Sequence, residues 1–409
     1  MSFSPFSSVV MGFSGFVTSA GRRFLAGAAL SGLALGVLTG CGAGGSPVLP
    51  GNDDKVTLQG KVKGGQQPIS GSTIQLYAVG TTGDGTASTP LLTTTVVTGA
   101  AGEFSITGDY TCPSITSEVY LIAKGGNPGL AAGTNNTALA LMAALGPCGN
   151  LTSATHIIIN EATTVGSVWP LTPFMNSYLA VGSSVANAQT LSTDFLEINK
   201  FINTDGGASP GPTLPAGFGA PVNALYSMAN ILASCANSPG GVAADGSACG
   251  NLFALATPGG GIAPTNIVDA ALNISKNPFQ NVVGLYNLSS ASVPFQPTLP
   301  SAPADWTLKI LPKIMLQLPS SLVGTGSTQA TTFTLGQAAP AGGLAVSLSS
   351  SATGFVTVSP ATVNVAAGAS SGAFSYSGLA NGPANLIASA TGYITYTELV
   401  TATDSLISL

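Results

Sequence analysis

The chain carries very little charge for its length of 409 residues. Charged residues make up 6% of the sequence, against roughly 25% in an ordinary soluble protein. The ten basic residues are too few for the positive surface that nucleic-acid binding needs, so we expect no nucleic-acid partner. Apolar residues make up 45% of the chain, which supplies hydrophobic cores and argues against a solvated, disordered protein.

Groups that carry acid–base or metal chemistry are also scarce. His156 is the single histidine, so a multi-histidine site for zinc or copper cannot form. No two cysteines have the C-x-x-C spacing of a zinc or redox motif. The acidic residues lack the spacing of a calcium-binding loop. We therefore expect no metal, no cofactor and no enzymatic activity.

An alternative hypothesis places an enzyme site at His156 and Glu161. A histidine that acts as a base needs an acceptor or acid nearby, and Glu161 follows His156 closely in the sequence. If Asn160 caps a helix, however, Glu161 lies in its first turn, where the helix dipole favours a carboxylate. We therefore expect both residues to be structural. Residues 368–372 fit the G-x-S-x-G pattern of serine hydrolases, but no histidine follows them in the sequence. They lie between two β runs, so we expect a hairpin turn of small residues.

The N-terminal 40 residues have the features of an export signal. Arg22 and Arg23 are the only arginines of the chain, and they precede an apolar run over residues 24–38. This run is shorter than the about 20 residues that a membrane span needs. It leads into Leu-Thr-Gly-Cys at 38–41, which resembles a bacterial lipobox. In that motif the cysteine, here Cys41, is acylated and becomes the first residue of the mature chain.

The resemblance implies that residues 1–40 are a lipoprotein signal peptide and that Cys41 carries acyl chains such as palmitate. Two or three acyl chains hold a protein firmly on a membrane, because each buried methylene contributes roughly 0.8 kcal/mol. Residues 41–54 are rich in Gly, Ser and Pro, which predicts a flexible tether. Gly42 stands where an Asp is associated with inner-membrane retention in some bacteria. We therefore expect a cell-envelope location, at the outer membrane or cell surface rather than the inner membrane.

Four further cysteines are available for disulfides in an exported protein, namely Cys112, Cys148, Cys235 and Cys249. Four cysteines allow three pairings. We favour the two local pairs, Cys112–Cys148 and Cys235–Cys249. The second pair closes a loop of about 15 residues, for which chain-entropy estimates give about 3 kcal/mol.

Residues 55–125 predict a β-sandwich. Short alternating or β-branched runs recur between clusters of Gly, Pro, Asp and Ser. Residues 60–77 (GKVKGGQQPISGSTIQLY) and 98–104 (TGAAGEF) resemble the carboxypeptidase-regulatory-like, or transthyretin-like, β-sandwich family. The resemblance implies a fold and no catalytic residue, and some related sandwiches bind carbohydrate. Gly99 stands where the family usually has Asp, which argues against an acidic or metal-binding turn.

Residues 138–290 predict a small all-α domain of roughly five to seven short helices. Leu191, Phe195 and Ile198 fall on one helical face, and the same spacing recurs after Pro221 and after Pro264. Residues 159–165 (INEATTV) resemble a stretch found in secreted bacterial proteins of undefined role.

Residues 293–304 predict a Pro-rich linker. Proline recurs at every third residue from Pro294 to Pro303, which matches the three-residue turn of polyproline II. We expect a stiff spacer of roughly 28 Å.

Residues 307–409 predict an immunoglobulin-like (Ig-like) sandwich of about seven strands. Three stretches resemble bacterial Ig-like surface domains: 342–350 (GGLAVSLSS), 358–363 (VSPATV) and 388–393 (ASATGY).

The expected fold class is therefore multidomain: a β-sandwich, then a small all-α domain, then an Ig-like β-sandwich. This organisation, the lipid anchor and the scarcity of catalytic groups predict a non-enzymatic, lipid-anchored cell-envelope protein for adhesion, scaffolding or display. Its expected partners are the membrane, through the lipid anchor, and polysaccharide or envelope proteins.

The alternative is a carbohydrate-binding surface protein, which would need aromatic rings grouped on one exposed face. We expect Trp169 to lie in a core and Trp306 to seat the linker on the Ig-like domain. Alternation along the strands should bury some of the remaining candidates and expose others. Those candidates are Tyr376, Tyr393 and Tyr396.

Overall fold

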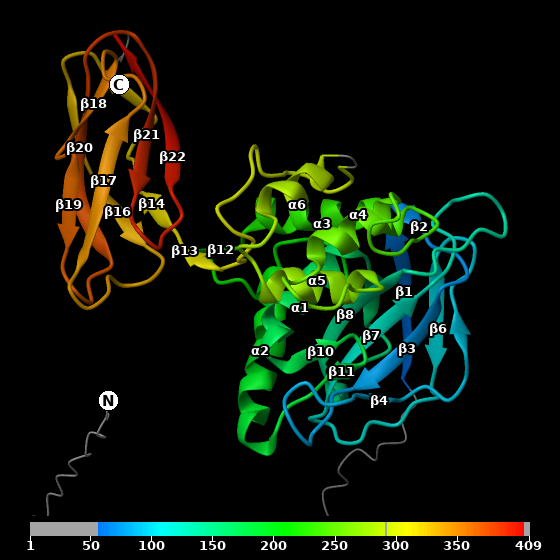
Figure 1. The fold of residues 1–409 in the computed structure, drawn as a ribbon. Helices are drawn as coiled ribbons and strands as arrows, with labels where there is room; N and C mark the ends of the chain where they lie inside the picture. Colours follow the sequence, from blue (N-terminus) through cyan, green and yellow to red (C-terminus); the bar gives the residue numbers. More distant parts are fainter. Residues whose placement is uncertain (1–55, 291–292, 405–409) are drawn as a thin grey trace, which may run out of the picture. The chain divides into compact units, whose positions relative to one another are not determined.

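The computed structural model describes residues 56–290 and 293–404. The predicted signal peptide, the tether and Cys41 lie outside these residues. The described chain is rich in β-structure, with several sheets and the helices α1 to α6 (Figure 1).

The first strands form two sheets. In one sheet β1 lies between β6, which is antiparallel to it, and β9, which is parallel to it, and β2 pairs with the end of β1. The other sheet has the order β4-β3-β7-β8, with β5 also paired to β3. The bounds are β1 Thr57–Gly64, β2 Gln67–Pro68, β3 Thr73–Ala78, β4 Thr89–Pro90, β5 Val96–Val97, β6 Glu103–Thr107, β7 Glu118–Lys124, β8 Ala140–Pro147 and β9 His156–Ile159.

Strand β1 shows why this sequence forms a half-buried strand. Its residues alternate, so that Leu58 and Val62 face the core while Lys61 faces solvent. Gly60 lies on the buried face, where a Cβ atom would come within 2.1 Å of the Ile157 carbonyl oxygen on the neighbouring β9. Glycine at this position therefore permits the close parallel pairing of β1 with β9.

The predicted all-α domain at 138–290 begins with two strands rather than a helix. Residues 140–144 of β8 are all buried, and β8 pairs with β7. A continuously buried strand shows no alternation, so its pattern cannot be distinguished from that of a buried helix. The β-structure that begins at residue 56 therefore extends to Ile159 and does not end near 125.

The helices follow β9 and lie together beside the β8 strand (Figure 1). Helix α2 has the predicted buried face of Leu191, Phe195 and Ile198. The helix bounds are α1 Glu161–Leu171, α2 Ala188–Phe201, α3 Val222–Ala236, α4 Ala248–Ala256, α5 Ile267–Lys276 and α6 Val282–Ser289, and the short strands β10 Met175–Ser177 and β11 Ala180–Val181 form a ribbon between α1 and α2.

One hydrophobic core joins these strands and helices. Buried side chains from Leu58 to Leu308 form a single cluster that includes both sheets and α1 to α6. The predicted β-sandwich and the predicted all-α domain are thus parts of one body, which we call the first body (residues 56–310).

The Pro-rich segment at 293–304 packs on the first body instead of standing free as a spacer. The Asn230 side chain on α3 donates to the Phe295 carbonyl and accepts from the Phe295 N–H, both at 3.0 Å. Trp306 is fully buried in the core of the first body, and its carbonyl accepts a 2.9 Å hydrogen bond from Trp169 Nε1. Proline spacing alone could not reveal these partners, because Asn230 lies far away in the sequence.

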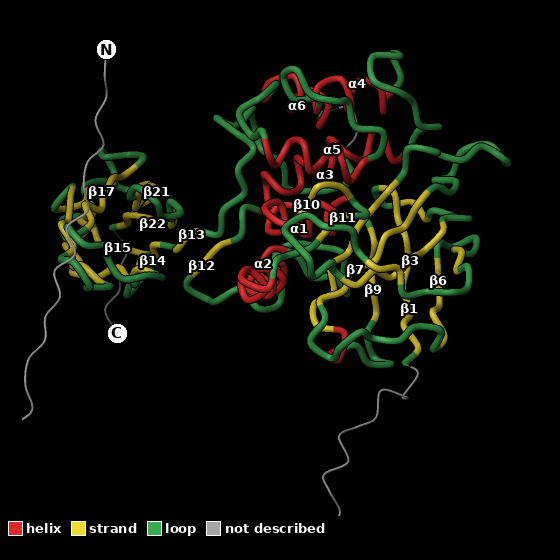
Figure 2. Tube along the Cα trace, turned by 60° about the horizontal axis from the view of Figure 1, so that its bottom comes forward, coloured by secondary structure: helices red, strands yellow, loops and turns green. Residues whose placement is uncertain are grey.

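The C-terminal strands form a two-sheet sandwich with its own core (Figure 2). One sheet has the order β14-β16-β20-β18 and the other β15-β22-β21-β17-β19. The bounds are β14 Ile314–Leu316, β15 Leu322–Gly324, β16 Thr328–Leu335, β17 Leu344–Ser350, β18 Val356–Ser359, β19 Thr362–Val365, β20 Ser371–Gly378, β21 Gly382–Ser389 and β22 Tyr396–Thr403. The strands expected from the sequence are β16 to β22, and the short β14 and β15 complete the two sheets.

At the junction with the first body, β12 (Phe218–Gly219) pairs with β13 (Leu311–Pro312).

Candidate functional site

Buried polar side chains are concentrated in the segment from Asn160 to Ser167, where Asn160, Glu161, Thr163, Thr164 and Ser167 are all buried. Asn160 is the N-cap of α1: its side chain accepts from the Thr163 N–H at 2.8 Å, and Thr163 Oγ1 accepts from the Asn160 N–H at 2.9 Å. This reciprocal capping box starts α1 immediately after β9. The predicted cap at Asn160 is therefore present in the structure.

Hydroxyl groups on α1 cover the open edge of β8. The Met142 N–H donates to Thr164 Oγ1 at 2.9 Å, and the Ala144 N–H donates to Ser167 Oγ at 3.0 Å. Thr163 Oγ1 donates to the Met142 carbonyl at 2.9 Å. An edge strand with unpaired backbone groups is costly when buried, so these side chains replace the missing neighbouring strand.

The Glu161 carboxylate also has a structural partner. Glu161 is fully buried, and the Gly65 N–H lies 2.9 Å from each of its two carboxylate oxygens. Burial raises the pKa of Glu161 to about 7, although the hydrogen bonds from its own backbone N–H and from Gly65 lower it. Glu161 thus ties the turn between β1 and β2 to the start of α1.

His156, at the start of β9, has other partners than Glu161 and does not share a site with it. Its side chain is exposed, and Nδ1 lies 3.2 Å from Asp205 Oδ1 and 3.3 Å from the Asp205 carbonyl oxygen. The Glu161 carboxylate instead accepts a hydrogen bond from the Gly65 N–H. The structure therefore does not bring together the pair that the enzyme hypothesis requires. Among residues 56–290 and 293–404, no group of three or more His, Cys, Asp and Glu side chains is arranged to hold a metal ion.

The structure contains two disulfides, Cys112–Cys148 and Cys235–Cys249, which are the two local pairs that the sequence favours. The first joins the loop before β7 to the end of β8. The second joins the end of α3 to the start of α4. The first disulfide therefore fixes a loop beside the β7–β8 pair, and the second fixes the end of one helix to the start of the next.

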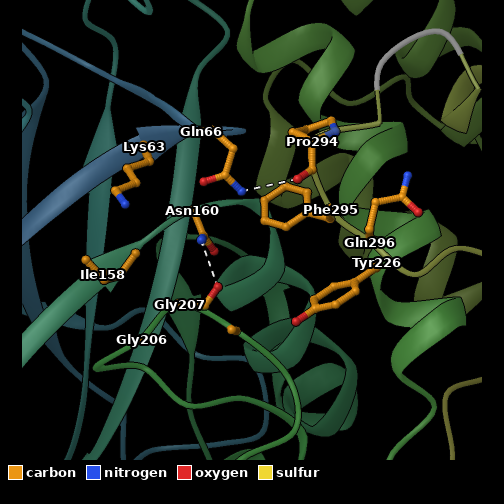
Figure 3. Close-up of a pocket in the computed structure, with 11 residues that line it drawn as sticks. Lys63, Gln66, Ile158, Asn160, Gly206, Gly207, Tyr226, Pro294, Phe295 and Gln296 are labelled. Atoms are coloured by element: carbon orange, nitrogen blue, oxygen red, sulfur yellow. Dashed lines mark hydrogen bonds between the residues drawn. The ribbon is translucent and has the colours of Figure 1, made fainter.

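A depression with several polar lining residues lies beside Asn160 in the first body (Figure 3). It has a volume of about 290 Å³. Five segments line it: the end of β1 with the following turn, β9 with Asn160, the loop at 206–208, α3, and residues 294–296. The lining residues are Lys63, Gln66, Ile158, Asn160, Gly206, Gly207, Ala208, Tyr226, Pro294, Phe295 and Gln296.

Several hydrogen bonds hold the walls of this pocket in place. Gln66 Nε2 donates to the Pro294 carbonyl at 3.2 Å, and Asn160 Nδ2 donates to the Gly207 carbonyl at 2.9 Å (Figure 3). The Tyr226 and Phe295 rings stack with their centroids 5.9 Å apart. Because the walls come from distant segments, no local sequence signal could identify Lys63, Gln66, Tyr226 or Phe295 as members of one site.

The aromatic residues considered for carbohydrate binding are dispersed. Tyr376 is fully buried and donates to the Ser320 carbonyl, whereas the hydroxyl of Tyr393 bonds Gln337 and that of Tyr396 bonds Glu398. Trp169 is half-buried and lines a second depression, of about 330 Å³, with Asp194 and Glu197. The described chain therefore does not group these rings on one exposed face.

Within the described ranges, no helix combines the length and apolar character that crossing a bilayer requires.

Comparison with known proteins found no matching family model and no matching curated protein. Among solved structures, the chain is similar to domains 4 and 5 of the S-layer protein SbsC, with 17% identity over 27% of this chain and 69% of that chain. Domains 5–6 of the same protein match with 20% identity over 23% of this chain and 44% of that chain, and domains 1–6 match with 10% identity over 85% and 54%. The TM-score is 0.19 in each case, which is too low for these likenesses to inform the fold or the role of this chain.

Proposed function

We propose that the chain is a non-enzymatic, lipid-anchored cell-envelope protein that displays its first body and Ig-like sandwich for adhesion or scaffolding. The observation that carries this proposal is the structural role of residues 156–167, the segment that contains the candidate catalytic residues His156 and Glu161. Its buried polar groups bond backbone atoms of the turn after β1, of β8 and of the 203–208 loop. Side chains engaged in this way build the body and are not available to a substrate.

The sequence supports the remainder of the proposal. The lipobox-like tetrad at 38–41 supplies an attachment point, and the two disulfides suit a protein outside the reducing cytoplasm. The resemblances to carboxypeptidase-regulatory-like and bacterial Ig-like domains are compatible with a modular surface protein.

Metabolic labelling and fractionation in a lipoprotein-exporting bacterium test this proposal. We expect the wild-type chain to incorporate a clickable palmitate analogue and to sediment with the envelope. Cys41→Ala should lose the label and leave the membrane fraction, whereas Gly42→Asp should keep the label and shift toward the inner membrane. A Cys41→Ala variant that remains labelled and membrane-bound would contradict the anchor.

A second candidate function is carbohydrate binding, which the pocket in Figure 3 favours. Its walls combine amide side chains with the stacked Tyr226 and Phe295 rings. Amides can exchange hydrogen bonds with sugar hydroxyls, and aromatic walls can pack against sugar C–H groups. Retention of the chain from residue 42 onward on a panel of insoluble polysaccharides and peptidoglycan tests this function.

A further inference from the structure

We propose that the pocket beside Asn160 binds a carboxylate-bearing sugar, with Lys63 as its counter-ion. This inference rests on the second candidate function and does not depend on the lipid anchor. It names the charged group that a ligand of this pocket should carry.

Lys63 is the charged residue among those that line the pocket. It is half-buried near the end of β1, and Figure 3 shows it apart from Tyr226 and Phe295, whereas Gln66 lies beside Phe295. Within residues 56–290 and 293–404, no carboxylate oxygen lies within 4.0 Å of its ammonium group. A partly buried ammonium without a counter-ion favours an anion, because its attraction is screened less than that of a fully exposed charge.

The acidic residues that adjoin the lining segments in the sequence are already engaged. Asp205, next to Gly206, directs its carboxylate to His156 at 3.2 Å. Glu161, next to Asn160, is fully buried and accepts from the Gly65 N–H. Neither carboxylate therefore serves as the partner of Lys63.

The rest of the lining is suited to a sugar ring. Gln66 commits its Nε2 to the Pro294 carbonyl, which leaves its Oε1 to accept from a hydroxyl. The stacked Tyr226 and Phe295 rings, which are 8% and 5% exposed, border the pocket with the small part of their surface that remains open. The volume of about 290 Å³ is at the lower end for ligand pockets, which suits one sugar unit rather than a long segment.

The experiment measures binding of three small probes to the chain from residue 42 onward by calorimetry or ligand-observed NMR. The probes are sodium glucuronate, glucose and N-acetylalanine. We expect glucuronate to bind about ten-fold or more tightly than glucose, because a charge-assisted hydrogen bond is lost with glucose. Glucuronate binding should weaken as salt is raised, and N-acetylalanine should bind more weakly than glucuronate.

Three variants locate the site. Lys63→Gln should weaken glucuronate binding about ten-fold or more and leave glucose binding unchanged. Lys61→Gln is the matched control, because Lys61 lies two residues earlier on the same face of β1 but does not line the pocket. Ala208→Trp should block the pocket by volume without changing charge. Circular dichroism and the thermal midpoint check that each variant is folded.

Each contrary outcome is distinct. Equal binding of glucose and glucuronate, both lost in Ala208→Trp, would overturn the role of Lys63 while carbohydrate binding survives. N-Acetylalanine that binds as tightly as glucuronate would overturn the preference for a sugar. Unchanged glucuronate binding in folded Lys63→Gln and Ala208→Trp would overturn the site itself.

Discussion

The Met142 N–H donates a 2.9 Å hydrogen bond to Thr164 Oγ1, which joins the edge of strand β8 that has no neighbouring strand to helix α1. Both residues are fully buried. Replacement of Thr164 by Val keeps the shape of the side chain but leaves the Met142 N–H without a partner. We expect Thr164→Val to lower the free energy of unfolding by about 1–3 kcal/mol, the cost of an unsatisfied buried donor. Urea denaturation measures this change.

Thr193→Val is the matched control for this prediction. Thr193 is exposed on α2, and its hydroxyl bonds the Gln189 carbonyl of its own helix. We expect this variant to change stability by less than about 0.5 kcal/mol. Equal effects of the two substitutions would show that Thr164 does not protect the β8 edge.

The second prediction concerns the pH dependence of stability through Glu161. Its pKa in the folded protein is about 7, raised by burial from the ordinary glutamate value of 4.5. The folded state therefore holds the Glu161 proton at pH values where the unfolded state has released it. This contribution to stability is fully present below about pH 4.5 and is lost as the pH rises through about 7, by an amount on the order of 3 kcal/mol.

Glu161→Gln tests this sign directly. The variant cannot ionise, so its unfolding free energy should fall less than that of the wild type between pH 5 and pH 8. Glu103→Gln on the exposed face of β6 is the control and should leave the wild-type pH profile unchanged. A wild-type profile that rises with pH relative to Glu161→Gln would contradict the prediction.

The third prediction concerns the packing of the Pro-rich segment on α3. Asn230 satisfies both backbone groups of the buried Phe295. We expect Asn230→Ala to destabilise the protein by about 2–3 kcal/mol and to accelerate hydrogen exchange at the Phe295 amide. Asn251→Ala, at an exposed position on α4, should alter neither quantity. Fast exchange at Phe295 in the wild type would instead support a free-standing spacer.

The fourth prediction follows from the presence of two separate hydrophobic cores. Phe253 is fully buried in the first body, and Tyr376 is fully buried in the C-terminal sandwich. We expect calorimetry to resolve two unfolding transitions. Phe253→Ala should lower one and Tyr376→Ala the other, each by about 3–5 kcal/mol of local stability. A single transition shifted equally by both variants would show that the cores unfold as one unit.

Local patterns in the sequence predict local structure well. The spacing of Leu191, Phe195 and Ile198 corresponds to the buried face of α2, and Asn160 caps α1 as expected. Alternation between turn residues predicts most strands of the C-terminal sandwich. Each of these features depends on neighbours within a few residues, so the pattern contains the information.

Features that depend on partners far away in the sequence could not be predicted from such local patterns. The continuously buried β8 lacks alternation, and its edge is satisfied by Thr163, Thr164 and Ser167 rather than by another strand. The proline spacing at 294–303 indicates a stiff segment but does not reveal that Asn230 binds it. The pocket lined by Lys63 and Tyr226 forms only after five separate segments meet.

The mass of the N-terminal tryptic peptide is the most direct test of the proposed lipid anchor. Trypsin cleaves after Arg23 and Lys55, and no Lys or Arg lies between them. From the membrane fraction of a lipoprotein-exporting bacterium, we predict a peptide spanning 41–55 whose Cys41 carries acyl chains. An uncleaved peptide spanning 24–55, or an unmodified Cys41, would contradict the proposal that this protein is anchored in the cell envelope by lipid.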